Sequence, residues 1–344
     1  MTAAIPPPDP LTVAVIGCGP VGALHAAGVA AAGRPSSAVL VAVCDPSVER
    51  RSALAARHSS APFEDIHALL RSVRPDVITV ATPDDRHRDP VLAALEAGCH
   101  VFCEKPLATS VDDARDMVLA ATRRGRFLAV DFNRRFGFAY RRARELIHQG
   151  LIGRPRQVLV HVVDRFPAPH VRTVPTAMFT TLLTHYFDLA RWLADGPGEV
   201  ERVQVTGAHA DETGLLAQVT LTLWLAGGAR GTIVAGYRTG QTRTWEETTV
   251  VGERGSLTIH DVTRAVTWTG TDPDQERTWR PDAFGPSGSF WQTIPDHLGT
   301  FLSALREGRA PEVSGQDGLV SLLVAAAAAR SWQTGGPVEV PHEP

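Results

Sequence analysis

Lys105 is the residue whose type and setting point most directly to chemistry. Of the 34 lysine and arginine side chains in the chain, Lys105 is the single lysine. Arginine keeps its proton near neutral pH, whereas a lysine loses its proton where its surroundings disfavour the charge. Coding bias would give the same skew, so composition alone leaves both explanations open. The segment Cys103-Glu104-Lys105-Pro106-Leu107, at the end of a short apolar run, favours a lysine that exchanges a proton. Pro106 restricts Lys105 to extended backbone angles, which helps to fix the direction of its amine.

A glycine-rich turn follows the first apolar run of the chain. The run 11–16 ends at Gly17-Cys18-Gly19-Pro20-Val21-Gly22, and an alanine-rich stretch up to Gly33 predicts a helix. In such a unit the first glycine allows a tight turn, the second lets the backbone approach a pyrophosphate, and the third lets helix and strand pack closely. Free amides at the start of the helix favour the phosphates. We therefore predict that residues 17–22 bind a dinucleotide, with a tight turn that binds nothing as the alternative.

Asp45 ends the second apolar run, residues 39–44, and lies where the acid that binds a ribose diol is expected. A carboxylate at this position repels a 2′-phosphate, so NAD is favoured over NADP. Arg50 and Arg51 lie close by in the sequence and leave NADP open.

Helix and strand patterns alternate up to about residue 131. Strands separated by single helices indicate an α/β Rossmann domain with a doubly wound parallel sheet, and ligands bind such sheets at the carboxyl ends of the strands. The segments 82–83, 104–106 and 131–134 each follow a predicted strand, so we expect them at the same crevice as the glycine turn. The predicted cofactor contacts outside the turn are Asp45, Thr82, Pro83, His87, Glu104, Lys105, Asn133 and Arg134. For His87 a solvated loop position is the alternative, and for Glu104 a surface ion pair.

From residue 132 the pattern changes to strands in which polar and apolar residues alternate. This predicts a C-terminal α+β domain with a large, mostly antiparallel open sheet, one face of which packs on helices while the other is available for subunit association. The expected strands are 156–164, 200–208, 216–225, 231–237, 246–252, 256–260 and 265–269. Met178–Leu193 is predicted as one helix with a polar stripe of Thr181, Thr184, His185 and Asp188. The arginines at positions 135, 141, 142 and 144 are expected on the solvated face of another helix.

Several of these segments together resemble the Gfo/Idh/MocA oxidoreductase family, which is named for glucose–fructose oxidoreductase and inositol dehydrogenase. The resemblance rests on Val15-Ile16-Gly17-Cys18-Gly19, Ala81-Thr82-Pro83 with His87, residues 94–101, Glu104-Lys105-Pro106-Leu107-Ala108, Asn133-Arg134-Arg135-Phe136, residues 150–153 and residues 335–338. It implies that Lys105 lies beside the nicotinamide and moves the hydroxyl proton of the substrate. It also implies that His185, in His185-Tyr186-Phe187-Asp188, is the catalytic histidine that orients the substrate or relays the proton. Homodimers or homotetramers formed through the open sheet are implied as well.

The chain departs from the family pattern four residues before His185. Sugar and cyclitol dehydrogenases of the family usually carry an aspartate there, whereas this chain has Thr181. A threonine holds no negative charge and cannot act as a base, so the relay is either Lys105 with His185 alone or is completed by another group, for which Tyr186 is a candidate. The predicted substrate contacts are Lys105, Arg134, Thr181, His185 and Tyr186. The loss of the aspartate makes a keto-sugar or another carbonyl compound at least as good a substrate as a simple polyol.

Composition excludes several classes of protein. The net charge of −3 gives no basic footprint for nucleic acid, and the longest apolar run, 319–329, is too short to span a bilayer. Residues 1–10 carry four prolines and are expected to be a disordered tail rather than a signal peptide. The four cysteines lack Cys-x-x-Cys spacing, which fits a reduced, cytoplasmic protein without a metal site. The expected domains are 11–131 and 132–344, and the loop 166–172 is expected either to cover the substrate or to have no role in binding.

Three functions are compatible with these observations. The first is an NAD(P)-dependent oxidoreductase that transfers hydride between nicotinamide and a hydroxyl or keto carbon of a sugar, cyclitol or related small molecule. The second is a non-redox sensor that binds the dinucleotide, which the change at Thr181 would favour. The third is a closed cycle in which transient oxidation is followed by elimination, hydrolysis or epimerisation.

Overall fold

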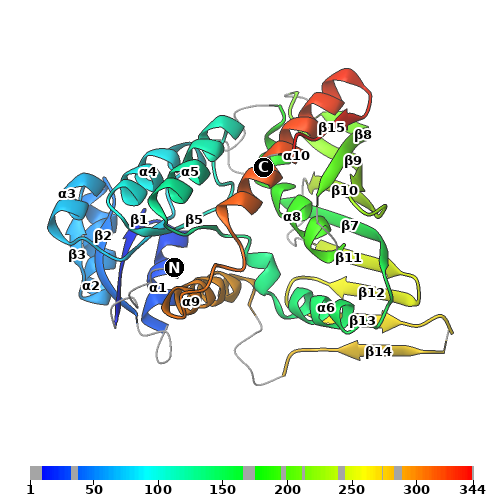
Figure 1. Cartoon of the computed structure of the whole chain (residues 1–344), viewed down its shortest axis with the longest axis horizontal. Coiled ribbons are helices and arrows are strands. Elements are labelled where there is room, and N and C mark those ends of the chain that lie inside the picture. Colours follow the sequence, from blue (N-terminus) through cyan, green and yellow to red (C-terminus); the bar gives the residue numbers. More distant parts are fainter. Residues whose placement is uncertain are drawn as a thin grey trace. The chain divides into compact units, whose positions relative to one another are not determined.

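The computed structural model describes residues 10–31, 38–165, 175–194, 199–210, 214–238, 245–272, 274–282 and 289–342. The chain forms two compact units (Figure 1). The first comprises Met1–Asn133 and Trp291–Leu319, and the second comprises Arg134–Phe290 and Val320–Pro344. The expected tail before Pro10, the helix stop at Gly33 and the loop 166–172 lie outside the described residues.

The first unit contains a six-stranded sheet in the order β3-β2-β1-β4-β5-β6, and every pair of neighbouring strands in it is parallel. This confirms the predicted doubly wound parallel sheet. The four residues of the central strand β4 are all buried, as expected for a strand covered on both faces. The strands are β1 (Leu11–Ile16), β2 (Ala38–Cys44), β3 (Ala61–Phe63), β4 (Val77–Val80), β5 (His100–Cys103) and β6 (Leu128–Val130). The intervening helices are α1 (Pro20–Ala31), α2 (Val48–His58), α3 (Ile66–Ser72), α4 (Arg88–Glu96) and α5 (Val111–Arg124), with a short 3-10 turn, η1 (Asp84–Arg86).

The helix α9 (Thr293–Arg306) returns to the first unit from far along the chain and packs on α1. Its side chains Leu298, Phe301 and Leu302 are fully buried in the core that also contains Phe102. Gly28 permits this contact, because a Cβ there would lie 3.0 Å from the Cα of Pro295. No sequence pattern indicated this return, and the first segment of the unit ends at Asn133, two residues after the expected end at 131.

The second unit contains a nine-stranded sheet in the order β14-β13-β12-β11-β7-β10-β9-β8-β15. Among the described strands of this sheet, only β7 and β10 are parallel neighbours, so the predicted mostly antiparallel sheet is confirmed. The strands are β7 (Pro155–Arg165), β8 (Val200–Ala210), β9 (Leu216–Leu225), β10 (Arg230–Arg238), β11 (Trp245–Gly252), β12 (Gly255–His260), β13 (Ala265–Thr269), β14 (Glu276–Trp279) and β15 (Val338–Glu339). The strand β14 was not predicted.

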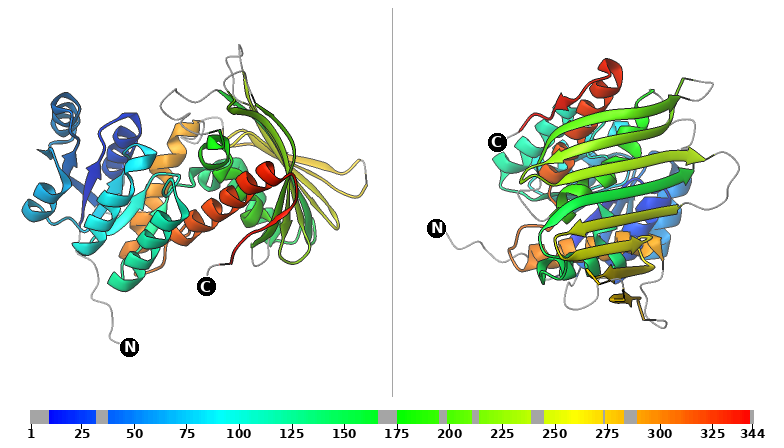
Figure 2. Two further views of the ribbon diagram at one scale, coloured as in Figure 1. Left: turned by 90° about the horizontal axis from the view of Figure 1, so that it is seen from above. Right: turned by 90° about the vertical axis from the view of Figure 1, so that its right-hand side faces the viewer.

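The helices of the second unit lie on one face of its sheet, and no described helix covers the other face (Figure 2). They are α6 (Phe138–His148), α7 (Ala177–Thr181), α8 (Thr184–Leu193) and the longer part of α10 (Gly315–Thr334), while η2 (Asn133–Phe136) and η4 (Phe290–Gln292) are short 3-10 turns. Leu159, Val234 and Trp245 are exposed on the uncovered face, on the neighbouring strands β7, β10 and β11.

Two expectations for the second unit are wrong in detail. The single helix Met178–Leu193 is divided into α7 and α8, because the hydroxyls of Thr180 and Thr181 both donate to the carbonyl of Ala177 and compete with the backbone pattern of the helix. Arg135, expected on a solvated face, is only 5 % exposed.

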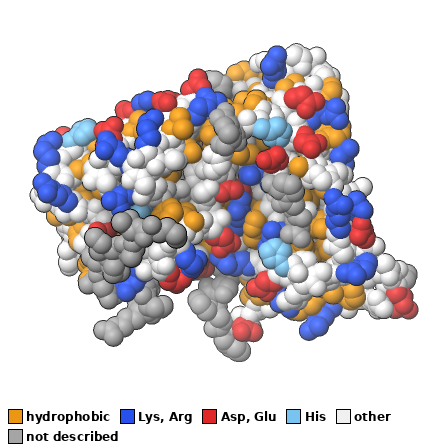
Figure 3. All heavy atoms as spheres, in the orientation of Figure 1, with side chains coloured by type: hydrophobic (Ala, Val, Ile, Leu, Met, Phe, Trp, Pro, Cys, Tyr) orange, Lys and Arg blue, Asp and Glu red, His pale blue; other side chains and the backbone are white. Residues whose placement is uncertain are grey.

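Charged side chains of both signs are interspersed over the face drawn in Figure 3, which agrees with the small net charge. Among the described residues, no helix combines the length and apolar character that crossing a membrane requires.

Candidate active site

The glycine turn between β1 and α1 is closely packed at two positions and open at the third. A Cβ on Gly22 would lie 1.8 Å from the carbonyl oxygen of Gly17, and one on Gly17 would lie 2.4 Å from that of Ala81. Gly17 also has a φ of +94°, which disfavours any side chain. A Cβ on Gly19 would meet nothing within 4 Å. The turn therefore leaves the backbone bare at Gly19, next to the free amides at the start of α1, as a bound pyrophosphate requires.

Asp45 lies directly beside this turn and is held by backbone amides. The N–H of Cys18 donates to its Oδ2 and the N–H of Ser47 to its Oδ1, each at 2.8 Å. Each carboxylate oxygen keeps a lone pair for a ribose hydroxyl. Arg51 donates to the carbonyl oxygens of Asp45 and Pro46 and also reaches Glu64, so its guanidinium is already engaged. The residues present fit NAD.

The four cysteines of the first unit are buried thiols, and none forms a disulfide. Burial, followed by the nearby negative charge of Asp45, raises the pKa of Cys18 to about 12, and burial raises that of Cys44 to about 12 as well. These thiols stay protonated and behave as small apolar side chains.

His87 joins the loop after β4 to the segment that carries Lys105. Its ring is fully buried, with Nδ1 2.9 Å from the carbonyl oxygen of Pro106 and Nε2 3.0 Å from that of Thr82. The solvated-loop alternative for His87 is therefore wrong. Through these two contacts His87 orients the Thr82-Pro83 segment and the backbone next to Lys105. Thr82 also donates its hydroxyl to the carbonyl of Arg86.

Lys105 follows β5 at the carboxyl edge of the parallel sheet and is half-buried. The N–H of Glu104 continues the strand pairing by donating to the carbonyl of Val80 at 2.9 Å. The N–H of Lys105 donates to Oε2 of Glu104 at 3.3 Å, and the Lys105–Pro106 peptide bond is cis. The backbone on both sides of the lysine is thus fixed by the sheet and by His87.

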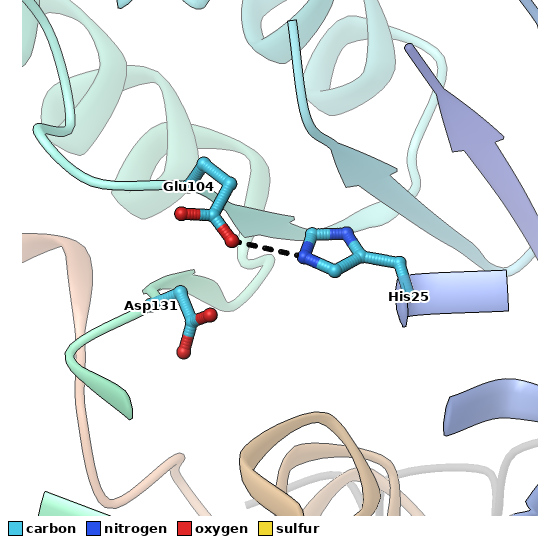
Figure 4. A group of neighbouring side chains, drawn as sticks. All are labelled: His25, Glu104 and Asp131. Atoms are coloured by element: carbon cyan, nitrogen blue, oxygen red, sulfur yellow. Dashed lines mark hydrogen bonds and ion pairs between the residues drawn. The ribbon is translucent and has the colours of Figure 1, made fainter. Parts of the chain in front are cut away.

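Glu104 belongs to a buried group of acids and histidines, shown in part in Figure 4. His25 Nε2, from α1, lies 3.1 Å from Glu104 Oε1, while His297 Nδ1, from α9, lies 2.6 Å from Asp131 Oδ1. Asp131 is 1 % exposed, and the side chain of Glu104 is 13 % exposed. The surface-pair alternative for Glu104 is wrong. No sequence motif indicated His25 or His297, and Asp131 was indicated only by its position after a strand.

The two acids of this group are shifted in opposite directions. Burial alone would raise the pKa of Glu104, but the hydrogen bond with His25, the hydrogen bond with Asp131 and the charge of Lys105 together lower it. Burial, the charge of Glu104 and the hydrogen bond with Glu104 raise the pKa of Asp131 well above its usual range, although the charge of Lys105 opposes this. Two neighbouring buried carboxyl groups of this kind do not ionise together readily.

Asn133, a predicted cofactor contact, is 4 % exposed. Its Nδ2 donates to the Thr293 hydroxyl at 2.8 Å, which fixes its amide at the start of α9.

His185 lies in the first turn of α8 in the second unit and is 5 % exposed. Thr184 and Asp188 of the same polar stripe are also buried, whereas Thr181 is partly exposed. Asp188 forms a buried ion pair with Arg135, whose Nε donates to Oδ2 at 2.7 Å and whose second nitrogen contacts Oδ1. This pair anchors the helix that carries His185.

Tyr186 and Arg134, both predicted substrate contacts, are part of a buried cluster around Glu246 on β11. The Tyr186 hydroxyl donates to Glu246 Oε2 at 2.8 Å, and Arg134 Nε donates to the same oxygen at 3.2 Å. Tyr140 donates to Glu246 Oε1 at 3.2 Å and lies 2.9 Å from the hydroxyl of Thr248. Burial raises the pKa of Tyr186 well above its usual range, so its hydroxyl stays protonated. Sequence patterns gave no signal for Glu246 or Tyr140.

Thr181, at the position where the family pattern has an aspartate, is paired with a phenol. Its Oγ1 donates to the carbonyl of Ala177 at 2.8 Å and lies 3.1 Å from the hydroxyl of Tyr237 on β10. Burial raises the pKa of Tyr237 to about 12. Tyr237 is thus a polar partner of Thr181, and no sequence pattern indicated it because it lies on a strand 56 residues away.

A hollow of about 980 Å³ opens at the opposite edge of the parallel sheet, lined by residues such as Leu11, Asp76, His100 and Phe127. These residues lie at the amino ends of β1, β4, β5 and β6. Because parallel sheets bind their ligands at the carboxyl ends of the strands, this hollow is not the candidate active site.

Four features together define a dinucleotide-binding oxidoreductase. They are the parallel sheet, the open glycine turn, Asp45 after β2 and Lys105 after β5. The chain belongs to the GFO/IDH/MocA oxidoreductase family. Residues 11–132 match the family's NAD-binding Rossmann fold, and residues 140–258 match its C-terminal domain. The resemblance inferred from the sequence is confirmed.

The similarity to named relatives covers nearly the whole chain. It is 31% identical to an inositol 2-dehydrogenase from Rubrobacter xylanophilus, over 96% of this chain and 93% of the relative. It is 28% identical to a myo-inositol 2-dehydrogenase from Thermotoga maritima, over 94% of this chain and 96% of the relative. Among solved structures, the WlbA dehydrogenase from Bordetella pertussis in complex with NADH and UDP-GlcNAcA superposes with a TM-score of 0.82 at 26% identity, covering 98% of this chain and 99% of that one.

Proposed function

We propose that the protein is an NAD-dependent dehydrogenase or reductase that transfers a hydride between the nicotinamide and a hydroxyl or keto carbon of a sugar, cyclitol or related small molecule. The observation that carries this proposal is the chain's one lysine, fixed at the carboxyl end of β5 by Glu104, His87 and Pro106 in the sheet that bears the glycine turn. When bound, the nicotinamide accepts or supplies the hydride. Relatives named inositol dehydrogenases support the substrate class.

The glycine turn and Asp45 would hold the cofactor. Gly19 gives the pyrophosphate access to the backbone, and the amides at the start of α1 offset its charge. Asp45 would accept hydrogen bonds from the ribose diol and repel a 2′-phosphate, which favours NAD over NADP. The engagement of Arg51 with Asp45, Pro46 and Glu64 supports the same preference.

Lys105 would accept the hydroxyl proton during oxidation and return it during reduction. His185 would orient the reacting hydroxyl or relay its proton, and Thr181 with Tyr237 would offer neutral hydroxyl groups where the family pattern has an aspartate. Because neither hydroxyl carries a charge at neutral pH, we favour a carbonyl compound as substrate at least as strongly as a polyol.

The test follows the absorbance of reduced nicotinamide while the wild type and Lys105→Met meet a panel of cyclitols, polyols and keto-sugars. We expect turnover in the wild type and a loss of about 10²–10⁴-fold in the variant, the usual contribution of a general acid or base. NADH binding, followed by fluorescence, should be unchanged. Lys105→Arg is the matched control, because it keeps the charge but cannot give up its proton. Turnover that survives in Lys105→Met would contradict the proposal.

A dinucleotide-binding sensor is the second candidate, and the neutral Thr181–Tyr237 pair favours it. A closed cycle that ends in elimination, hydrolysis or epimerisation is the third. NADH binding without turnover of any compound in the panel would support the sensor, and NAD that stays on the purified protein would support the closed cycle.

We also propose that the protein is cytoplasmic and forms a homodimer or homotetramer. The four reduced, buried cysteines support the compartment. The exposed Leu159, Val234 and Trp245 on the uncovered sheet face support the association. A charge introduced at this face by Val234→Glu should yield monomers in sedimentation.

A further inference from the structure

Glu104 and Asp131 bring two carboxyl groups together in the interior of the first unit. They follow the adjacent parallel strands β5 and β6, which places them side by side at the carboxyl edge of the sheet. A carboxylate oxygen of each, together with a ring nitrogen of His25, lies within 4.8 Å of the other two. Figure 4 shows the three side chains converging from the two loops and from α1. Asp131 is buried and Glu104 nearly so.

The hydrogen-bond donors around the two acids are unequally shared. Glu104 receives the N–H of Lys105 at Oε2 and faces Nε2 of His25 at Oε1. Nδ1 of His25 is buried with no hydrogen-bond partner among the described residues. The tautomer with the proton on Nε2 is therefore favoured, because this proton can be donated to Glu104. Asp131 faces Nδ1 of His297 at Oδ1, whereas its Oδ2 is buried and receives no donor from the described residues.

A buried carboxylate oxygen without a donor is costly, and a neighbouring carboxylate makes it more so. The other groups around Asp131 do not remove this cost. Cys103 on β5 is a protonated thiol, because burial and then the charge of Glu104 raise its pKa well above the usual range. The ring of Phe102 makes T-shaped contacts with His25 and His297, at centroid distances of 5.4 and 4.8 Å. Lys105 is the cation near the pair, and its charge acts on both acids.

We propose that Glu104 and Asp131 hold a single proton between them, with Asp131 as a neutral acid that donates from Oδ2 to an ionised Glu104. Every polar atom that faces this contact is then satisfied: Glu104 accepts from His25, Lys105 N–H and Asp131, and Asp131 accepts from His297. A divalent cation in the same place would have to displace the proton that His25 directs at Glu104. The chemistry of the group therefore favours a shared proton over a metal.

The consequence for the reaction rests on the proposed role of Lys105. A negative charge behind the lysine attracts its ammonium group. A second negative charge would attract that group more strongly and oppose the transfer of its proton. Asp131 and His297 are thus positioning residues that act on Lys105 through Glu104, by keeping the charge behind it at one.

The first test needs neither substrate nor turnover. At a pH of about 7.5, exposed carboxyl groups are ionised, so a carboxylic-acid C=O stretching band in the infrared spectrum of the wild type reports a buried acid. We expect this band in the wild type and its loss in Asp131→Asn. Asp116→Asn, which removes an exposed acid on α5, is the matched control and should keep the band. A wild type without the band would overturn the proposal, as would one equivalent of tightly bound metal that Asp131→Asn loses.

The second test compares pH–rate profiles. Asparagine at position 131 keeps an acceptor for His297 and places an N–H group toward Glu104, so it mimics the neutral acid. We expect Asp131→Asn to retain the wild-type pH–rate profile, and Glu104→Gln, which removes the one charge, to move the profile to lower pH. A similar downward shift in Asp131→Asn would mean that Asp131 is ionised, and the proposal would be wrong. If no variant turns over, the infrared test still decides the protonation state.

Discussion

Each unit of the molecule buries a cluster of ionisable groups, and the two clusters are built in opposite ways. Around Glu246 there is one carboxylate, one permanent cation in Arg134 and two phenol donors in Tyr140 and Tyr186. In the first unit, Glu104 and Asp131 are two carboxyl groups flanked by the imidazoles His25 and His297. Arginine and buried tyrosine keep their protons throughout the physiological range, whereas carboxyl and imidazole groups do not.

We therefore expect the Glu246 cluster to stabilise the fold, whereas the Glu104–Asp131 cluster can also exchange protons. In the Glu246 cluster, Arg134, Tyr140 and Tyr186 all donate to one carboxylate, and these contacts join α8 to β11. The charge of the Glu104–Asp131 pair depends on whether the pair holds one proton, and Lys105 is adjacent to it. Four predictions follow from this contrast, ordered from the largest expected effect to the smallest.

Glu246→Ala should cost about 3–5 kcal/mol of unfolding free energy, because it leaves Arg134 buried without its carboxylate. The measurement is urea unfolding of the full chain at neutral pH. Glu247→Ala, on the same strand but partly exposed, is the control and should change stability by less than about 0.5 kcal/mol. A small loss in Glu246→Ala would mean that Arg134 finds another partner and that the cluster is not a fixed ion pair.

Asp131 should make stability depend on pH in the sense opposite to an ordinary acid. Because its pKa is raised in the folded protein, its contribution is full below the unfolded value of about 4 and is lost as pH rises toward the folded value. The stability of the wild type relative to Asp131→Asn should therefore fall by about 1.4 kcal/mol per pH unit within that window. Urea unfolding at a series of pH values measures this, and parallel curves for the two proteins would contradict the shared proton.

Tyr186→Phe should cost about 1–3 kcal/mol of stability, the loss expected when a buried charged acceptor loses a donor. Turnover should change little, since the hydroxyl is committed to Glu246. The measurement pairs unfolding with kcat/KM. A large fall in kcat/KM at unchanged stability would instead make Tyr186 the substrate contact that its place next to His185 suggested.

Tyr237→Phe should have the smallest effect on stability, about 1 kcal/mol or less, because one neutral hydrogen bond with Thr181 is lost. With a pKa of about 12, Tyr237 does not titrate where the enzyme would work, so the pH–rate profile should keep its shape. If the variant lost its alkaline limb, Tyr237 would be the group that replaces the missing aspartate as a base.

The parts of the site that have a local sequence signal were predictable. The turn 17–22, Asp45 and the Glu104-Lys105-Pro106 segment each carry a local signal, since their spacing from a strand end decides their place. The partners of those residues were not predictable. His297 contacts Asp131 across 166 residues, and Glu246 contacts Arg134 across 112, so no periodicity links them. The division between α7 and α8 was missed because it depends on two hydroxyl contacts with Ala177 rather than on hydrophobic pattern.

The return of α9 to the first unit also determines the order in which the molecule can be completed during synthesis. The parallel sheet is translated within the first 130 residues, yet the core beside Phe102 and Val29 is closed by Leu298 and Phe301. Until the ribosome has made those residues, the nascent cofactor domain has an open apolar surface and Asp131 lacks its histidine. The domain that begins the chain is therefore among the last parts to be finished, and a chaperone would meet it in that half-closed form.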